Sequence, residues 1–263
     1  LAPVIKADSY MKVGAKVCPA GEELLYAGRL AGAARADPGS GSNYLCMPPT
    51  STSDGTNADP DTGGSLWSVE YYTPSYPSGT AVYSGFDRSH GANGYDVPCA
   101  ICARKYIETF SIWGTQSCPL LAERSYAGYM MAGSDGSVGR TEFTCVEEDF
   151  EKATFDGTQN TDATLSLVES YSYTSSQLED GIAMGYHGNM ELTCAKCTFN
   201  SSPGQVYTRW GSKSCPEGRN TLYAGFMTGT CTTGHGGSTT HVCLAPDMQL
   251  KEFAEGSQLA ADM

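Results

Sequence analysis

The sequence predicts an all-β protein with few helices, built from tandem disulfide-stapled repeats of about a hundred residues. Its 31 glycines and 16 tyrosines, with many Ser and Thr, favour short strands and turns over long helices. Its 11 cysteines are typical of a disulfide framework formed in an oxidising, extracellular compartment. The same motifs occur three times along the chain, which indicates a tandem array.

Four motifs mark the repeat at nearly fixed offsets. A glycine precedes a Cys-Pro pair by four residues, and Tyr-Ala-Gly begins eight residues after that cysteine. A second cysteine follows the first by 27 or 28 residues, and the first two copies close with Cys-x-x-Cys. The Cys-Pro cysteines are Cys18, Cys118 and Cys215; the second cysteines are Cys46, Cys145 and Cys243; the closing pairs are Cys99 with Cys102 and Cys194 with Cys197.

These motifs divide the chain into three parts. Copy one spans residues 1–104, copy two spans 105–203, and a truncated copy three with a polar tail spans 204–263. Copy three has no Cys-x-x-Cys motif, and it carries the extra Cys231 in a loop rich in Gly, Thr and His. We therefore expect copy three to be a half-domain.

Short strands should flank the motifs in each copy, and the Asp- and Gly-rich stretches between them should form loops. The expected strands include residues 43–47, 66–72, 108–113, 141–146, 164–173 and 205–210. Residues 248–254 give a weak indication of a helix, because three apolar residues there have helical spacing.

Several motifs carry a resemblance to a known family. They are Tyr207-Thr208-Arg209-Trp210-Gly211, Leu222-Tyr223-Ala224-Gly225, Asn43-Tyr44-Leu45-Cys46, Val97-Pro98-Cys99 and Glu191-Leu192-Thr193-Cys194. Together the motifs cover nearly the whole chain, which resembles the globular repeat of short-chain collagen C4-like extracellular proteins of marine invertebrates. The chain departs from that pattern in lacking a Gly-X-Y tract and in having Lys12-Val13 where Arg-Trp is expected. The resemblance implies a matrix or cell-surface context and no established enzymatic activity.

Four cysteines in a copy allow three disulfide connectivities. Positions i and i+3 of an extended strand point to opposite faces, so the Cys-x-x-Cys sulfurs should bond to two different earlier cysteines. The alternative joins the two earlier cysteines and closes a tight loop within Cys-x-x-Cys; the preserved 28-residue offset in copy three favours it. The first connectivity pairs Cys99 with Cys46, Cys102 with Cys18, Cys194 with Cys145 and Cys197 with Cys118. Zinc binding or thioredoxin-like chemistry fits less well, since the two pairs lie far apart and each ends a strand.

With an odd number of cysteines, at least one has no partner within the chain. Cys231 is the candidate for a free thiol or an intermolecular bridge, unless it bonds to Cys215 or Cys243 and leaves the other of them unpaired. Asn200 begins an N-x-S triplet and is a possible glycosylation site. The first residues lack the features of a signal peptide, so we expect that one has been removed.

The net charge of −13 disfavours nucleic acid and anionic membranes as partners and favours cations. No apolar run reaches the roughly 18 residues of a membrane span. Two acidic loops at matching places in copies one and two suit Ca²⁺, although solvated turn residues are the commoner explanation of such loops. The candidate calcium ligands are Asp54, Asn57, Asp59, Asp61, Asp156, Asn160 and Asp162.

No motif of a nucleophilic, metal-dependent or phosphate-binding enzyme occurs, so the sequence predicts a protein that is not an enzyme and needs no cofactor. A half-domain leaves a sheet edge uncovered, and such an edge is a template for another chain. We therefore expect a secreted structural protein that polymerises head to tail through copy three into a filament, sheath, adhesive or matrix. The alternatives are a carbohydrate-binding protein, calcium-dependent or not, and a monomeric module on which copy three packs as a cap.

Overall fold

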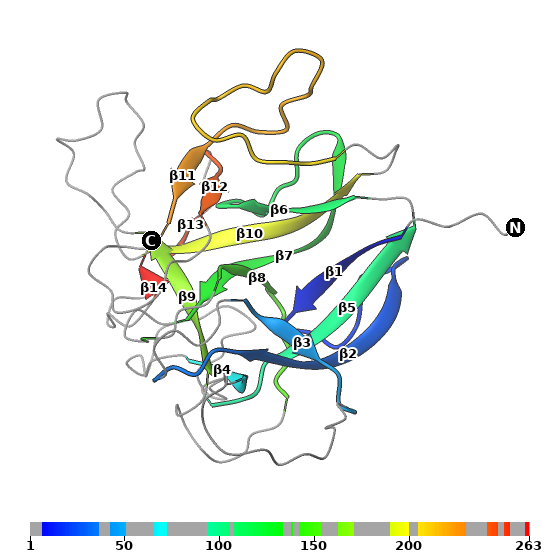
Figure 1. Cartoon of the computed structure of the whole chain (residues 1–263), viewed down its shortest axis with the longest axis vertical. Helices are drawn as coiled ribbons and strands as arrows, with labels where there is room; N and C mark the ends of the chain where they lie inside the picture. The colour runs from blue at the N-terminus through cyan, green and yellow to red at the C-terminus, as the bar shows by residue number, and fades with distance from the viewer. Residues whose placement is uncertain are drawn as a thin grey trace, which may run out of the picture.

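The protein is all-β in the part that the structure describes. The computed structural model describes residues 7–36, 43–50, 66–72, 94–105, 108–133, 138, 142–153, 163–170, 190–199, 205–229, 241–246, 250–252 and 261–262. These residues form fourteen strands of a mixed sheet and no helix (Figure 1). Among them, no segment is a helix long and apolar enough to cross a membrane.

Copies one and two each contribute five strands in the same order. Those of copy one are β1 (Ala7–Val13), β2 (Glu23–Gly32), β3 (Leu45–Met47), β4 (Trp67–Tyr71) and β5 (Pro98–Lys105). Those of copy two are β6 (Thr109–Trp113), β7 (Ala122–Ala132), β8 (Thr144–Glu147), β9 (Ala163–Ser170) and β10 (Met190–Phe199). In each copy the strand with Cys-x-x-Cys, β5 or β10, comes last in sequence.

The Cys-x-x-Cys strand lies in the middle of its copy. β5 pairs antiparallel with β1 on one side and β2 on the other, and β10 pairs in the same way with β6 and β7. The strand that carries the Tyr-Ala-Gly motif also pairs with two further strands, β2 with β3 and β4, and β7 with β8 and β9. The two copies therefore share one pairing scheme.

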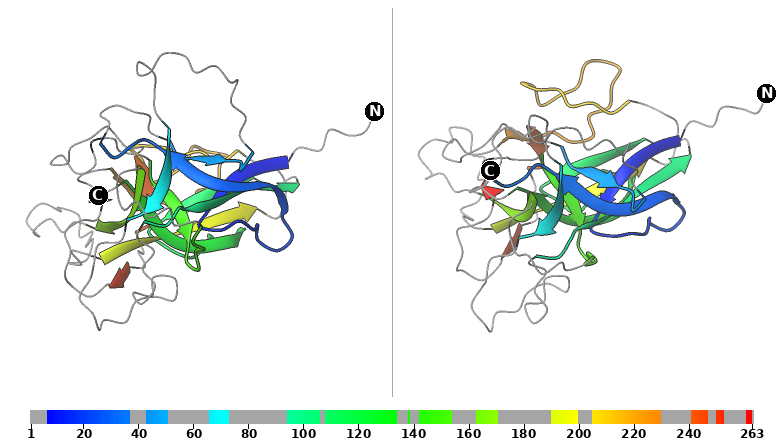
Figure 2. Two further views of the ribbon diagram at one scale, coloured as in Figure 1. Left: turned by 90° about the horizontal axis from the view of Figure 1, so that it is seen from below. Right: turned by 60° about the horizontal axis from the view of Figure 1, so that its bottom comes forward.

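Parallel pairings join the two copies. β8 lies beside β1, with Val146 opposite Val13, and β9 lies beside β4, with Ala163 opposite Val69. Figure 2 shows the strands of copies one and two packed against each other from two further directions. Pairings between segments so distant in sequence hold both copies in one body.

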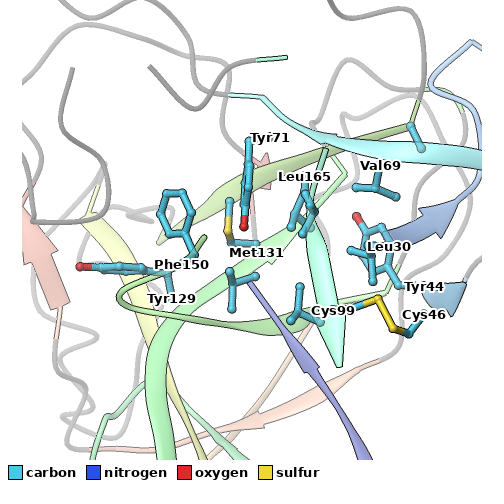
Figure 3. Packing of buried hydrophobic residues seen from close by; sticks show 14 of the residues in the cluster. Leu30, Tyr44, Cys46, Val69, Tyr71, Cys99, Tyr129, Met131, Phe150 and Leu165 are labelled. Carbon is cyan, nitrogen blue, oxygen red and sulfur yellow. A yellow bond between two sulfur atoms is a disulfide. The ribbon is translucent and has the colours of Figure 1, made fainter. Parts of the chain in front are cut away.

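The largest core cluster draws on both copies. Leu30 and Tyr71 from copy one and Tyr129 and Met131 from copy two are all completely buried in it (Figure 3). The Tyr71 ring lies 4.6 Å from the Phe150 ring, measured between centroids. Burying a side chain of this size contributes about 1.5–3 kcal/mol, so the shared core stabilises the pair of copies strongly.

Copy three adds two short strands to the edge formed by β6. β11 (Phe226–Thr228) pairs antiparallel with β12 (Val242–Leu244), and β12 pairs parallel with β6. Residues 205–210 form no strand, so the strand expected there is wrong. The weak indication of a helix at 248–254 is also wrong, because β13 (Leu250–Glu252) is a strand paired with β10. β14 (Ala261–Asp262) pairs with β9.

Candidate functional site

Four disulfides anchor the Cys-x-x-Cys strands of copies one and two. They join Cys18 to Cys102, Cys46 to Cys99, Cys118 to Cys197 and Cys145 to Cys194. This is the connectivity that opposite faces of an extended strand favour, and the alternative with a bridge inside Cys-x-x-Cys is not the one formed. Each copy is thus closed by two bridges from its last strand to its earlier part.

The tyrosine of Tyr-Ala-Gly caps the second cysteine in every copy. The Tyr26 hydroxyl donates a hydrogen bond to the backbone carbonyl of Cys46 over 3.0 Å, and that of Tyr126 to Cys145 over 3.1 Å. In copy three, the hydroxyl of Tyr223 donates to the carbonyl of Cys243 over 2.9 Å. This role was not predicted from the sequence, and it accounts for the fixed spacing between the two motifs.

The glycine of Tyr-Ala-Gly permits two strands to approach closely. A Cβ atom at Gly28 would lie 1.8 Å from the carbonyl oxygen of Met47, and one at Gly225 would lie 1.8 Å from that of Leu244. At Gly128 the corresponding distance, to the carbonyl oxygen of Val146, is 1.7 Å. A side chain of any kind is excluded at these positions, since the backbone occupies the space.

The Cys-Pro turn is also the same in all three copies. A backbone N–H three residues after the proline donates to the proline carbonyl, over 3.2 Å in copy one, 2.9 Å in copy two and 3.1 Å in copy three. The glycine before each turn has a positive φ, of 96° at Gly14, 86° at Gly114 and 75° at Gly211. The Cys-Pro turn of copy three therefore has the same hydrogen bond and the same preceding glycine conformation as in the other two copies.

Copy three differs in the state of its cysteines. Cys215 and Cys243 carry free thiols, which corrects their expected place in the disulfide framework. It also excludes, in this structure, the expected bridges from Cys231 to either of them. The physical reason is that the corresponding cysteines of copies one and two bond to a Cys-x-x-Cys strand, and copy three has none.

A groove of about 1100 Å³ opens beside the two free thiols. One wall is residues 205–215 of copy three, a second is residues 218–227, and Cys243 lies between them in the lining. Part of β6 and Phe199 of β10 line the remaining side. Figure 1 draws the copy-three segment in yellow to orange beyond β6. We call this cavity the copy-three groove.

Two aromatic side chains on the wall of the groove are exposed. Tyr207 is 49% exposed, whereas the residues at the same position, Tyr10 in copy one and Phe110 in copy two, are 6% and 8% exposed. Trp210 is 45% exposed, whereas Val13 at the same position in copy one is completely buried. In copies one and two, the residues at these positions pair with the Cys-x-x-Cys strand, and the Tyr10 ring also stacks on Tyr126 of the next copy.

Copy three docks on copy two as copy two docks on copy one. The backbone N–H of Thr109 donates to the carboxylate of Asp8 over 2.9 Å, and that of Val206 donates to the carboxylate of Glu108. A small cluster at the first junction contains Tyr10, Tyr126 and Cys194.

The cluster at the second junction contains Phe110 and Tyr223, which occupy the positions of Tyr10 and Tyr126. Among the described residues, none of copy three takes the position of Cys194 in this cluster.

Burial alters the ionisation of groups beside the groove. Desolvation raises the pKa of the Cys243 thiol, while a hydrogen bond from Tyr223 acts in the opposite direction. Desolvation is the main cause that raises the pKa of the Tyr223 hydroxyl, and the interaction with the neighbouring Cys243 raises it further. Both groups are therefore neutral near pH 7, so Cys243 is a protected thiol and becomes reactive only as its thiolate forms.

The other expected sites lie outside the described residues. They are Cys231, the possible glycosylation site Asn200 and the calcium candidates Asp54, Asn57, Asp59, Asp61, Asp156, Asn160 and Asp162. Within the described ranges, no group of His, Cys, Asp and Glu side chains is arranged to hold a metal ion.

Comparison with known proteins adds no relative to this picture. No protein-family model matches the chain, and a search of curated protein sequences finds no match.

Proposed function

We propose that the protein is a secreted structural subunit of an extracellular assembly and that it joins the next subunit head to tail through copy three. The observation that carries this proposal is the open copy-three groove, with exposed Tyr207 and Trp210 on its wall. The four disulfides are typical of a protein that folds in an oxidising, extracellular compartment. A filament, sheath, adhesive or matrix is the kind of assembly that such a subunit builds.

The opposite end of the array is also apolar. Leu24, Leu25 and Tyr26 of β2 are exposed in copy one, and we call them the head face. In copy two, two residues at these positions contact the preceding copy: Ser125 donates to Glu22 over 2.9 Å, and the Tyr126 ring stacks on the Tyr10 ring. Within the part of the chain that the structure describes, no other copy packs on the head face, which leaves its side chains exposed.

Repeat arrays that stay monomeric need terminal repeats with polar outer faces. Here apolar side chains are exposed at both ends: the head face and, in copy three, Tyr207, Trp210 and Met227, which we call the tail face. A head-to-tail contact between two different faces leaves one of each free at the ends, so it extends into a filament unless a ring closes. This supports polymerisation rather than a closed dimer.

Light scattering of the full chain over a hundredfold range of concentration tests the proposal. The average mass is expected to rise with concentration, and Leu25→Asp on the head face or Trp210→Asp on the tail face should each abolish the rise. Leu120→Asp is the matched control, because Leu120 is fully exposed in the copy-two turn and belongs to neither face. A constant monomer mass, or equal loss in the control, would contradict the proposal.

Carbohydrate binding is the second candidate, because exposed aromatic rings beside a groove can stack on sugars. Selective binding on a glycan array that is lost in Trp210→Ala would support it over assembly.

A further inference from the structure

The complete copies define what belongs in the copy-three groove. On β10, Cys194 lies opposite Trp113 of β6 and Gly128 of β7, and three residues later Cys197 lies opposite Phe110 and near Arg124. The strand is thus held on both sides by backbone pairing and on both faces by a disulfide. Copy one repeats this register at β5.

Copy three presents the same positions without the strand. Trp210 and Gly225 take the places of Trp113 and Gly128. Both residues line the groove, as do residues 211–215 and 218–224 between them in sequence. The structure pairs no strand with residues 205–210 in the part of the chain that it describes. An extended segment in this groove would extend the pairing scheme of the first two copies to the third.

The two free thiols match the two bridges of that segment. In copy two, Cys145 bonds to the first cysteine of Cys-x-x-Cys, and Cys118 bonds to the second. Cys243 and Cys215 occupy those places and both line the groove. The two thiols are a feature that is independent of the exposed aromatic side chains. They require the bound strand to carry two cysteines at the Cys-x-x-Cys spacing.

The residues between the cysteines are also constrained. On β10 these are Ala195, which is completely buried, and Lys196, whose ammonium group lies 5.1 Å from the centre of the Tyr10 ring and is attracted by the carboxylate of Asp8. At the copy-three groove the same surroundings are provided by Phe110 and Glu108, and both line it. A small residue followed by a lysine therefore matches the aromatic ring and the carboxylate at this site.

The described parts of this chain do not supply the segment. All four cysteines of the two Cys-x-x-Cys motifs are bridged and completely buried, so a folded second copy cannot lend them. The strands β13 and β14 of the C-terminal region lie against β10 and β9 instead.

We propose that the copy-three groove binds an extended strand that carries Cys-x-x-Cys, with its first cysteine bonded to Cys243 and its second to Cys215. This inference rests on the proposed function and names the partner of the same site. The bound strand would pair laterally with residues 207–210, as the Cys-x-x-Cys strand pairs with the corresponding residues in copies one and two.

Each bridge forms by thiol–disulfide exchange with a small disulfide such as oxidised glutathione. A cysteine thiolate of the strand attacks glutathione disulfide, giving a mixed disulfide and one glutathione thiol. The Cys243 or Cys215 thiolate then attacks the strand's sulfur and releases the second glutathione. Two protein thiols are oxidised and one glutathione disulfide is reduced per bridge, so the adduct weighs four hydrogens less than protein plus strand.

The test uses the full chain, a glutathione redox buffer and a synthetic peptide with the sequence of residues 190–199. Intact mass without reduction is expected to show a one-to-one adduct lacking four hydrogens, and peptide mapping should find the two bridges named above. The same peptide with both cysteines replaced by serine should give no adduct. Replacing its lysine by glutamate should slow adduct formation about two- to fivefold, because a like charge then faces Glu108.

Cys215→Ser in the protein should retain one bridge, through Cys243, which keeps the test informative if the double bridge alters the fold. No adduct, the reversed pairing, or a bridge from Cys231 to Cys215 or Cys243 would overturn the proposal. Light scattering separates it from the proposed function. Self-association of the protein without formation of the peptide adduct would overturn only the proposed strand binding. Formation of the adduct without any self-association would overturn only the proposed head-to-tail assembly.

Discussion

Leu244 pairs in parallel with Trp113, in the way that Val146 pairs in parallel with Val13. Each copy thus places the strand of its second cysteine beside the opening strand of the copy before it. Because the relation holds at both junctions, copy three is positioned as a third member of the array. What it lacks is the central strand that the other two copies carry.

The close approach at Gly128 can be tested by adding one carbon. Gly128→Ala places a Cβ 1.7 Å from the carbonyl oxygen of Val146, so β7 and β8 must separate and the free energy of unfolding should fall by about 3 kcal/mol or more. Chemical denaturation measures the loss. Gly21→Ala is the control: nothing lies within 4 Å of its Cβ, and its φ of 85° alone should cost about 1–2 kcal/mol. Equal losses in the two variants would contradict the close contact.

Removal of one bridge should weaken the first copy by a predictable amount. The Cys46–Cys99 disulfide spans 53 residues, so replacing both cysteines by alanine should lower the free energy of unfolding by about 4 kcal/mol in the chain-entropy model. Urea denaturation under non-reducing conditions measures it. The single variant Cys46→Ala should show a similar loss and one new thiol, and that thiol should map to Cys99. A thiol at Cys102 instead would contradict the connectivity.

Lys196 should make stability depend on pH. Burial lowers its pKa to about 8 from an ordinary value of 10.5, so between these values the unfolded chain holds the proton more tightly and stability rises with pH. The destabilisation is fully present below pH 8. Lys196→Met should therefore be more stable than the wild type at pH 7, by about 1–3 kcal/mol, and the difference should shrink by pH 10.

Denaturation of both proteins at pH 7 and pH 10 measures this difference. Lys16→Met, at an exposed position, is the control for removal of a positive charge. A stability difference that stays constant with pH would contradict the role assigned to Lys196.

The Cys243 thiol should react slowly and respond to Tyr223. Burial raises the pKa of Cys243, and a hydrogen bond from Tyr223 counters this in part. Tyr223→Phe removes the hydrogen bond, so at pH 8 less thiolate is present and alkylation by iodoacetamide should slow several-fold. Peptide mapping measures the rate, with Cys215 in the same sample as the reference. Faster alkylation of Cys243 in the variant would contradict this account.

The disulfide connectivity followed from one local rule about the sequence. Cys99 and Cys102 are three residues apart on an extended strand, so their sulfurs point to opposite faces and bond to Cys46 and Cys18. The strands around these cysteines followed for the same reason, because their alternation and flanking turns are local signals. The all-β class required no more than that.

Other features of the fold depend on partners that are distant in sequence. Residues 205–210 have the composition of a strand but form none, because no strand pairs with them in the described part of the chain. The pairing of β12 with β6 was not predicted either, since it joins residues more than a hundred positions apart. The fixed spacing between the Tyr-Ala-Gly motif and the second cysteine was visible in the sequence. The spacing alone did not reveal the hydrogen bond from the Tyr223 hydroxyl to the Cys243 carbonyl.

The central claim is that copy three is an incomplete copy with an open strand position. The most direct measurement is alkylation of the folded, non-reduced full chain followed by peptide mapping. The account predicts alkylated Cys215 and Cys243, with the other cysteines of the framework joined as four bridges. A bridge between Cys215 and Cys243, or from either of them to Cys231, would show that copy three closes on itself and would contradict the account.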